Sequence, residues 1–135
     1  MNVLAIGTEI VECLRIARMI ERHGDLFINR VYTPVEIRYC HSRMHSTQHF
    51  AGRWAAKEAV LKTLGTKWQR GLTFQDIEIH NDEAGKLSVG LRGGARDVVV
   101  ARGIREIMLS VSHARSHAIA YAMALGAERN DGSER

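Results

Sequence analysis

Glu58 and Lys62 stand out as residues that could do chemistry, because they project from an apolar face of the longest helical pattern in the chain. Residues 50–66, FAGRWAAKEAVLKTLGT, are apolar nearly all round at about 100° per residue, which is typical of a buried helix. Buried charges need partners. At i and i+4 the two residues predict either a helix ion pair contributing roughly 0.2–0.5 kcal/mol, or a cation bound by Glu58 and an anion met by Lys62. In the second case Gly65 and Thr66 close the helix beside that site.

Glu9 is another acid in an apolar setting. It belongs to residues 3–10, VLAIGTEI, which predict a buried strand in which Gly7 allows another backbone to come close. An acid at this place is either a surface residue at the end of the strand or a ligand of a site.

Three arginines share one face of a helix predicted over residues 12–23. Arg15, Arg18 and Arg22 fall at i, i+3 and i+7, while Cys13 and Ile16 belong to the apolar stripe opposite. The stripe is either a solvated helix face or a docking surface for an acidic helix or for phosphates, which guanidinium groups bind in a bidentate manner.

Histidines recur every four residues at His41, His45 and His49, a spacing that could mimic a metal site on a helix. We expect surface histidines instead, because no carboxylate or cysteine completes a ligand set. Ser46 and Thr47 also predict a fresh N-cap for the long helix, which would break the stripe.

The composition indicates one ordinary globular domain. We expect the domain over residues 1–125, followed by a polar, disordered tail over 126–135. Cys13 and Cys40 do not suggest a disulfide framework, which favours a reducing compartment. No leader or membrane-spanning segment is evident, so we expect a cytoplasmic protein. The net charge of +4 favours anionic partners.

The remaining patterns mix helices with antiparallel strands and predict the α+β class. Thr33 and Pro34 begin a helix that runs to about Ser42, and a second short helix covers 95–102. Strands are expected at 74–80, 86–91, 107–112 and 117–125. The last strand carries only alanine on one face, which suits close contact with the long helix.

Four stretches together resemble the holo-[acyl-carrier-protein] synthase family, the small phosphopantetheinyl transferases. They are IGTEIVEC at 6–13, FAGRWAAKEAVLKTLGT at 50–66, FQDIEI at 74–79 and SVSHARSHAIAYAMA at 110–124. The resemblance implies the 4′-phosphopantetheinyl transferase fold, with an antiparallel sheet packed on the long helix. It also implies the family reaction: a serine of apo acyl carrier protein attacks the β-phosphate of coenzyme A, and adenosine 3′,5′-bisphosphate leaves.

The resemblance implies a role for each charged residue of the first two stretches. Glu9 and Glu58 would hold a Mg²⁺ ion that bridges the pyrophosphate of coenzyme A, an ion that accepts one or two carboxylates. Lys62 would contact the phosphates and offset charge on the transferred group. The acidic carrier protein would give Arg15, Arg18 and Arg22 a binding partner.

Further residues of the same stretches are implied in coenzyme binding and catalysis. The coenzyme-binding residues would be Arg53, Lys62, Gly65, Thr66 and His113. The catalytic residues would be Glu58, Lys62 and His113. The general base is open between His113, Glu9, another acid and a metal-bound water, and His113 could equally cap the hairpin turn. Family members of this short type form trimers with each active site at a subunit boundary.

The chain departs from the family pattern at two positions. Glu9 stands where Asp is usual, so metal preference or rate is expected to change. Lys67 replaces the second glycine of the usual Gly-Thr-Gly loop and could add a phosphate contact. Two other functions compete: a homologue that binds coenzyme A or carrier protein without turnover, and a basic nucleic-acid-binding module using the arginine stripe, Lys67, Trp68 and Arg70. The second is less favoured because it leaves Glu58 and Lys62 unexplained.

Overall fold

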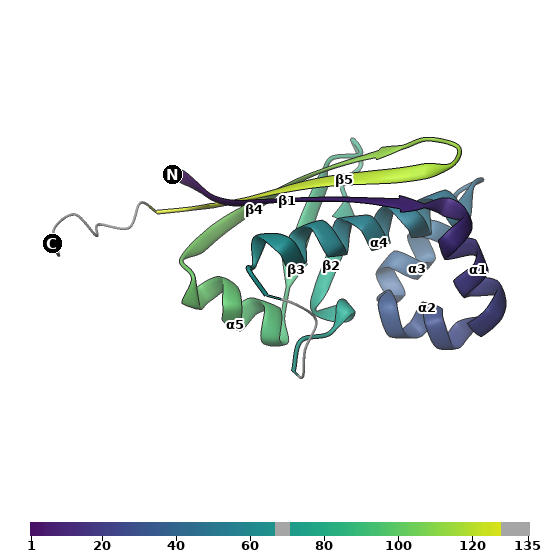
Figure 1. Cartoon of the computed structure of the whole chain (residues 1–135), viewed down its shortest axis with the longest axis horizontal. Helices are drawn as coiled ribbons and strands as arrows, with labels where there is room; N and C mark the ends of the chain where they lie inside the picture. Colours follow the sequence, from purple (N-terminus) through teal and green to yellow (C-terminus); the bar gives the residue numbers. More distant parts are fainter. Residues whose placement is uncertain (67–70, 128–135) are drawn as a thin grey trace, which may run out of the picture.

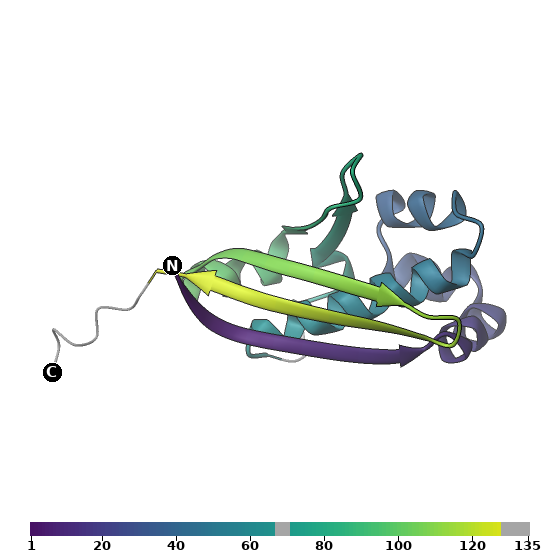
Figure 2. The same ribbon diagram turned by 90° about the horizontal axis from the view of Figure 1, so that it is seen from above.

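A three-stranded antiparallel sheet forms one layer of the molecule, in the order β1-β5-β4 (Figure 1). A computed structural model describes residues 1–66 and 71–127, and its three strands are β1 (Asn2–Glu12), β4 (Ile104–His113) and β5 (His117–Gly126). Seen from above, β5 lies between the other two and nothing described covers the outer face of the sheet (Figure 2). The sheet therefore joins the first strand of the chain to the last.

The long helix α4 (Ser46–Thr63) packs against the inner face of this sheet (Figure 1). The contact is made of small residues that are fully buried: Ala118, Ala120, Ala122 and Ala124 on β5, and Ala51, Ala55, Ala56 and Ala59 on α4. A Cβ atom at Gly7 of β1 would lie 2.2 Å from the carbonyl oxygen of Ala59. The predicted packing of the alanine face on the long helix is confirmed, as is the close backbone approach at Gly7.

Three short helices lie at one end of α4: α1 (Cys13–His23), α2 (Asp25–Val31) and α3 (Pro34–His41). The predicted start of α3 is confirmed in detail. Thr33 is the N-cap, its side chain accepts the backbone N–H of Glu36, and the Glu36 carboxylate accepts the N–H of Thr33 in return. This reciprocal capping satisfies two backbone donors at the helix start.

The second half of the chain begins with a hairpin of β2 (Ile77–Asn81) and β3 (Leu87–Leu91), followed by α5 (Gly93–Ala101) and β4. The strand expected from residue 74 is wrong over its first three residues, which form a 3₁₀ turn, η1 (Phe74–Asp76). Thr73 and Asp76 exchange capping hydrogen bonds there, and this local pairing competes with extended structure.

The α+β class with its antiparallel sheet on a long helix is confirmed, but two local predictions are corrected. β1 is not a buried strand, because Ile6 and Ile10 on its outer face are 56% and 59% exposed. The N-cap of α4 is His45, and Ser46 is already helical. Lys67, Trp68, Arg70 and residues 128–135 of the expected tail lie outside the described residues. In the described part of the chain, no helix is long and apolar enough to span a membrane.

Candidate active site

Lys62 joins the C-terminal half of α4 to the middle of β1. Its Nζ lies 2.8 Å from Oε1 of Glu9 and donates a hydrogen bond of 2.7 Å to the carbonyl of Thr8. The Lys62 side chain is 52% exposed and that of Glu9 is 20% exposed, so the pair faces solvent on one side. Glu58 is half-buried one helical turn before Lys62 and on the same side of α4. The structure therefore brings the predicted acid of the first stretch to the predicted lysine of the second.

Glu9 lies well inside β1, so the interpretation of this residue as a strand-end surface acid is wrong. Its position on the strand is set by Gly7, where the missing Cβ lets β1 approach Ala59 and Lys62 of α4. Glu9 is two residues after Gly7, and residues two apart in a strand share one face. The Glu9 side chain therefore points towards α4, as Gly7 does.

The end of α4 is closed as the sequence predicts. Gly65 has a φ of 69°, a left-handed conformation that glycine adopts without a Cβ penalty, and its N–H donates to the carbonyl of Lys62. The guanidinium of Arg102, which follows α5, lies over this turn and would be 2.7 Å from a Cβ at Gly65. Thr66 is half-buried directly after the turn.

Arg53 and His113 form a second group of polar side chains, near the N-terminal half of α4. The Arg53 guanidinium is 4.2 Å from the ring centroid of Tyr39 and donates a hydrogen bond to Oδ1 of Asn81. The residue is 5% exposed, and its Nε has no hydrogen-bond partner among the described residues. A buried guanidinium with an unsatisfied N–H is a suitable donor for an anionic ligand.

The imidazole of His113 packs on α4 rather than on the hairpin turn. A Cβ at Gly52 would lie 2.2 Å from its Nε2, and its ring centroid is 5.1 Å from that of His49. Although much of the residue is exposed, burial of the ring lowers the pKa of His113, and the charge of Arg53 lowers it further. Burial also lowers the pKa of His49, with His113 and Arg43 contributing. His113 is therefore neutral at neutral pH and able to accept a proton.

The two groups do not meet within one copy of the chain. Arg53 faces Tyr39 of α3 and Asn81 of β2, whereas Lys62 faces Thr8 and Glu9 of β1. Arg53 and Glu58 are five residues apart, which places them about 140° apart around the helix. The predicted site residues thus form two separate groups on α4.

A family model described as the 4′-phosphopantetheinyl transferase superfamily matches residues 5–122. The chain belongs to this superfamily. Among curated relatives, the holo-[acyl-carrier-protein] synthase of Koribacter versatilis is 43% identical over 118 residues, covering 87% of this chain and 94% of the relative. That of Rhodopirellula baltica is 44% identical over 123 residues, covering 91% and 98%. The predicted membership of the holo-[acyl-carrier-protein] synthase family is confirmed.

Solved structures of this family share the fold. The holo-[acyl-carrier-protein] synthase of Plasmodium yoelii has a TM-score of 0.81 at 34% identity, covering 94% of this chain and 98% of the other. The Helicobacter pylori enzyme, crystallised in complex with coenzyme A, has a TM-score of 0.79 at 28% identity, covering 90% of this chain and its whole length. The predicted transferase fold and enzyme class are confirmed.

The residues that would hold the metal of this family fit a hard divalent cation. Mg²⁺ prefers one or two carboxylates together with phosphate oxygens and water, and two carboxylates are offered by Glu9, which contacts Lys62, and by Glu58, one helical turn before Lys62. No set of three or more candidate metal-ligating side chains occurs in the described ranges, 1–66 and 71–127. Two carboxylates leave the remaining positions of such an ion to phosphate oxygens and water.

Sequence reasoning missed the deepest charge of α4. Lys57, rather than Glu58 or Lys62, is fully buried, and its Nζ lies 2.8 Å from Oε1 of Glu36, which is also fully buried. The helical pattern places Lys57 in the same helix as the candidates Glu58 and Lys62, and it does not show which of the three side chains is buried. The signal that could have found it is the capping box at Thr33, since a Glu at N3 of a buried helix start needs a counter-charge.

The arginine stripe lies on the exposed face of α1. Arg15, Arg18 and Arg22 line a shallow hollow of about 350 Å³ together with Glu12 and Met19. The guanidinium carbon of Arg15 is 5.0 Å from the ring centroid of Trp54 on α4, a cation–π contact that holds it near the neighbouring groove.

That groove is an apolar hollow of about 450 Å³ between α1, α2 and α4. Its lining includes Ile16, Met19, Leu26, Phe27 and Trp54. Leu26 is 69% exposed at this groove. Basic and apolar surfaces thus adjoin on this end of the molecule.

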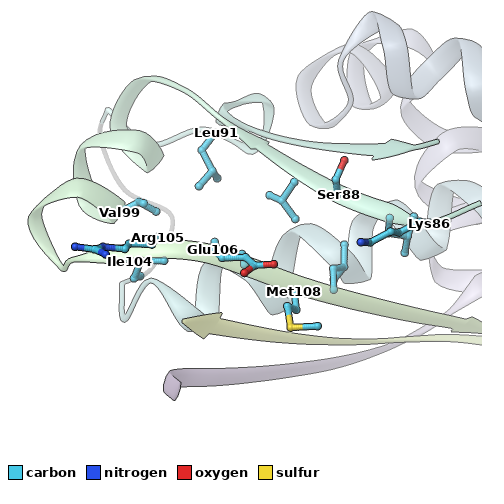
Figure 3. A pocket seen from close by; sticks show the side chains of 12 residues that line it. Lys86, Ser88, Leu91, Val99, Ile104, Arg105, Glu106 and Met108 are labelled. Carbon is cyan, nitrogen blue, oxygen red and sulfur yellow. The ribbon is translucent and has the colours of Figure 1, made fainter. Parts of the chain in front are cut away.

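A separate hollow of about 400 Å³ lies between β3 and β4 (Figure 3). Lys86 and Arg105 stand at its opposite ends, with Leu91, Val99 and Met108 between them. The predicted site residues lie outside its lining, so the hollow adds nothing to the two groups on α4.

Proposed function

We propose that the chain transfers the 4′-phosphopantetheine group of coenzyme A to a serine of an apo acyl carrier protein. The observation that carries the proposal is the contact between Lys62 and Glu9, which joins two family motifs 53 residues apart in the sequence. The serine oxygen forms a bond to the β-phosphorus, and the bond from that phosphorus to the bridging oxygen breaks. The serine proton passes to a base, and adenosine 3′,5′-bisphosphate leaves with the bridging oxygen. Such a transfer depends on positioning and on neutralising charge.

Glu9 and Glu58 would hold Mg²⁺ against the pyrophosphate. The ion, when bound, supplies positive charge to the phosphate oxygens. Lys62 is exposed enough to turn from Glu9 towards the phosphates, and its ammonium would then offset charge on the transferred group. Gly65 and Thr66 at the end of α4 would line the path of the nucleotide.

Arg53 and His113 would bind the coenzyme from a neighbouring copy of the chain. The unsatisfied Nε of Arg53 supports a role in anion binding. The lowered pKa of His113 supports a neutral imidazole that can accept a proton or a hydrogen bond. Because the two groups diverge around α4, one copy would supply Glu9, Glu58 and Lys62, and the next would supply Arg53 and His113.

We propose a homotrimer assembled through the outer face of the sheet. Cross-strand rows on this face are apolar: Ile6 pairs with Met123 and Met123 with Met108, while Ile10 pairs with Ile119. Ile6, Ile10, Met108 and Ile119 are between 48% and 59% exposed. An uncovered apolar patch of this kind indicates an interface.

The carrier protein would dock on α1. Its acidic surface would meet Arg15, Arg18 and Arg22, and an apolar side chain would enter the groove beside Trp54. Raising the salt concentration should increase the KM for the carrier protein, because this encounter depends on a field of exposed charges.

Intact-mass spectrometry of an apo acyl carrier protein, incubated with the chain, coenzyme A and Mg²⁺, tests the function directly. The carrier should gain the mass of one phosphopantetheine group, and Glu58→Gln should abolish the gain while the protein keeps its circular dichroism spectrum. Asp97→Asn, an exposed acid on α5, is the matched control and should retain the rate. No transfer by the wild type, with several carriers and with Mn²⁺ tried, would refute the proposal and favour a homologue that only binds coenzyme A.

Ile6→Lys tests the assembly. It should convert the trimer to monomers in sedimentation velocity and remove activity, because the buried lysine charges would meet without partners. Val100→Lys on α5, where the wild-type residue is 69% exposed, is the control and should leave the trimer intact. A wild-type chain that sediments as a monomer at high concentration would contradict the proposed trimer.

A further inference from the structure

Lys57 and Glu36 form a buried ion pair that neither of the two groups on α4 uses. The ammonium of Lys57 donates to Oε1 of Glu36, to the carbonyl of Phe74 at 2.9 Å and to the carbonyl of Ile77. Three donors thus meet three acceptors, and the ammonium is fully satisfied. The pair fastens α4 to the first turn of α3 and to both ends of η1.

Glu36 is satisfied to the same degree. Oε1 accepts the backbone N–H of Thr33 at 2.9 Å, and Oε2 accepts the N–H of Ile79 at 2.7 Å. Burial lowers the pKa of Lys57, and the charge and hydrogen bond of Glu36 offset only part of that shift. The three acceptors around Nζ match the three donors of an ammonium group.

A pair of this kind is a poor way to gain stability, because desolvation of two charges offsets much of their attraction. What it does supply is direction, since the ammonium fits its three acceptors in only one orientation of α4. The contact of α4 with β5 is made of small alanine side chains on both sides, which give little resistance to rotation, so the polar contacts of Lys57 add a directional constraint.

Rotation of α4 matters for the proposed site because Glu58 follows Lys57 directly. Side-chain atoms lie about 5–6 Å from a helix axis, so a rotation of roughly 20° would move the Glu58 carboxylate by about 2 Å. Binding and catalytic groups need to be held within roughly 0.5 Å of their working geometry. Gly7 allows the short distance between α4 and β1, but it has no side chain that could hold the helix in one rotation.

We infer that Lys57 is a positioning residue for the transfer reaction: its buried contacts set the rotation of α4 and so align Glu58 and Lys62 with Glu9. The inference rests on the proposed function. It assigns Lys57 no contact with coenzyme A, carrier protein or metal.

The decisive variant is Lys57→Met combined with Glu36→Gln. Lys57→Met alone leaves a buried carboxylate without its cation and is expected to unfold the chain. The double variant removes both charges at similar volume, so it should stay folded, with a lower melting temperature because the carbonyls of Phe74 and Ile77 each lose a donor. We expect it to lose roughly 10–100-fold in kcat and in affinity for Mn²⁺, the usual effect of removing a residue that orients metal ligands.

Mn²⁺ affinity is measured by electron paramagnetic resonance in the presence of coenzyme A, without carrier protein. Tyr32→Phe is the matched control, because it removes another buried side-chain hydrogen bond to α4, from Tyr32 Oη to the carbonyl of Phe50 at 2.7 Å. It should lower the melting temperature and leave Mn²⁺ affinity unchanged. An equal loss of affinity in Tyr32→Phe, or wild-type kcat and affinity in the double variant, would overturn the inference.

The proposed function is judged separately by the wild type. If the wild type transfers phosphopantetheine, the function stands and the variants decide the role of Lys57. If the wild type transfers nothing, the function fails, while the Mn²⁺ titration of the same variants still reports whether Lys57 aligns the two acids.

Discussion

Gly7→Ala should destabilise the chain strongly, because the glycine lies where β1 crosses α4. The new Cβ would sit 2.2 Å from the carbonyl oxygen of Ala59 and 2.9 Å from Cβ of Lys62. Non-bonded carbon contacts have their optimum near 3.5–4.0 Å, so the strand and the helix would have to separate by about 1 Å. Both neighbours are backbone or the base of a side chain, and neither can rotate away.

The cost of such overpacking is about 1–3 kcal/mol. For a chain of this size, each kcal/mol lowers the melting temperature by about 4 °C, so the expected loss is roughly 4–12 °C. Thermal unfolding followed by circular dichroism measures it. Since the Lys62–Glu9 contact spans the same crossing, transfer activity should fall even at temperatures where the variant is folded.

Gly90→Ala is the matched control for this prediction. It also adds a methyl group to a glycine of a strand, but the nearest atom is Nε2 of the His80 side chain at 3.3 Å, which can move. Its melting temperature should stay near that of the wild type. Equal melting temperatures for Gly7→Ala and Gly90→Ala would refute this reasoning. They would mean that β1 and α4 can move apart at Gly7 without loss of stability.

Three further measurements address other parts of the structure. Thr33→Ala should cost about 0.5–2 kcal/mol in urea unfolding by removing one half of the capping box, and an unchanged midpoint would argue against that cap. Ala122→Leu should destabilise the fully buried alanine face by about 1–3 kcal/mol; a neutral effect would mean that α4 can shift away from β5. NMR titration should give His113 a pKa below 6.5, rising in Arg53→Gln, and no rise would show that burial alone sets it. Because unfolded histidine binds its proton at higher pH, the contribution of His113 lowers stability as the pH falls below about 6.5.

Much of this architecture follows from local patterns. The alternating alanines of residues 117–125 predicted a strand against a helix, and the Thr33-Pro34 pair predicted the start of α3, because both features depend only on neighbouring residues. The end of α4 at Gly65 was predictable for the same reason.

The parts that sequence reasoning missed depend on which residues meet across the chain. Helical periodicity identified α4 as buried but could not tell that Lys57, rather than Glu58 or Lys62, enters the core, because the choice depends on a carboxylate 21 residues earlier in the chain. The exposure of Ile6 and Ile10 was missed because an apolar run in a strand does not tell which of its two faces meets the core. Phe74–Asp76 was missed because a capping pair outweighed a weak strand pattern.

The order of the sheet has a consequence for how the protein is made. The central strand β5 is the last of the described elements, while β1 is the first, and Asn2 pairs with Gly126. The ribosome synthesises β1, α4 and β4 before β5. Until β5 is made, the alanines of α4 that pack on it and the strand edges of β1 and β4 are uncovered. Sheets built from such distant pairings form slowly, and their open edges are prone to aggregate. The three-stranded sheet can therefore close only once β5 has emerged from the exit tunnel.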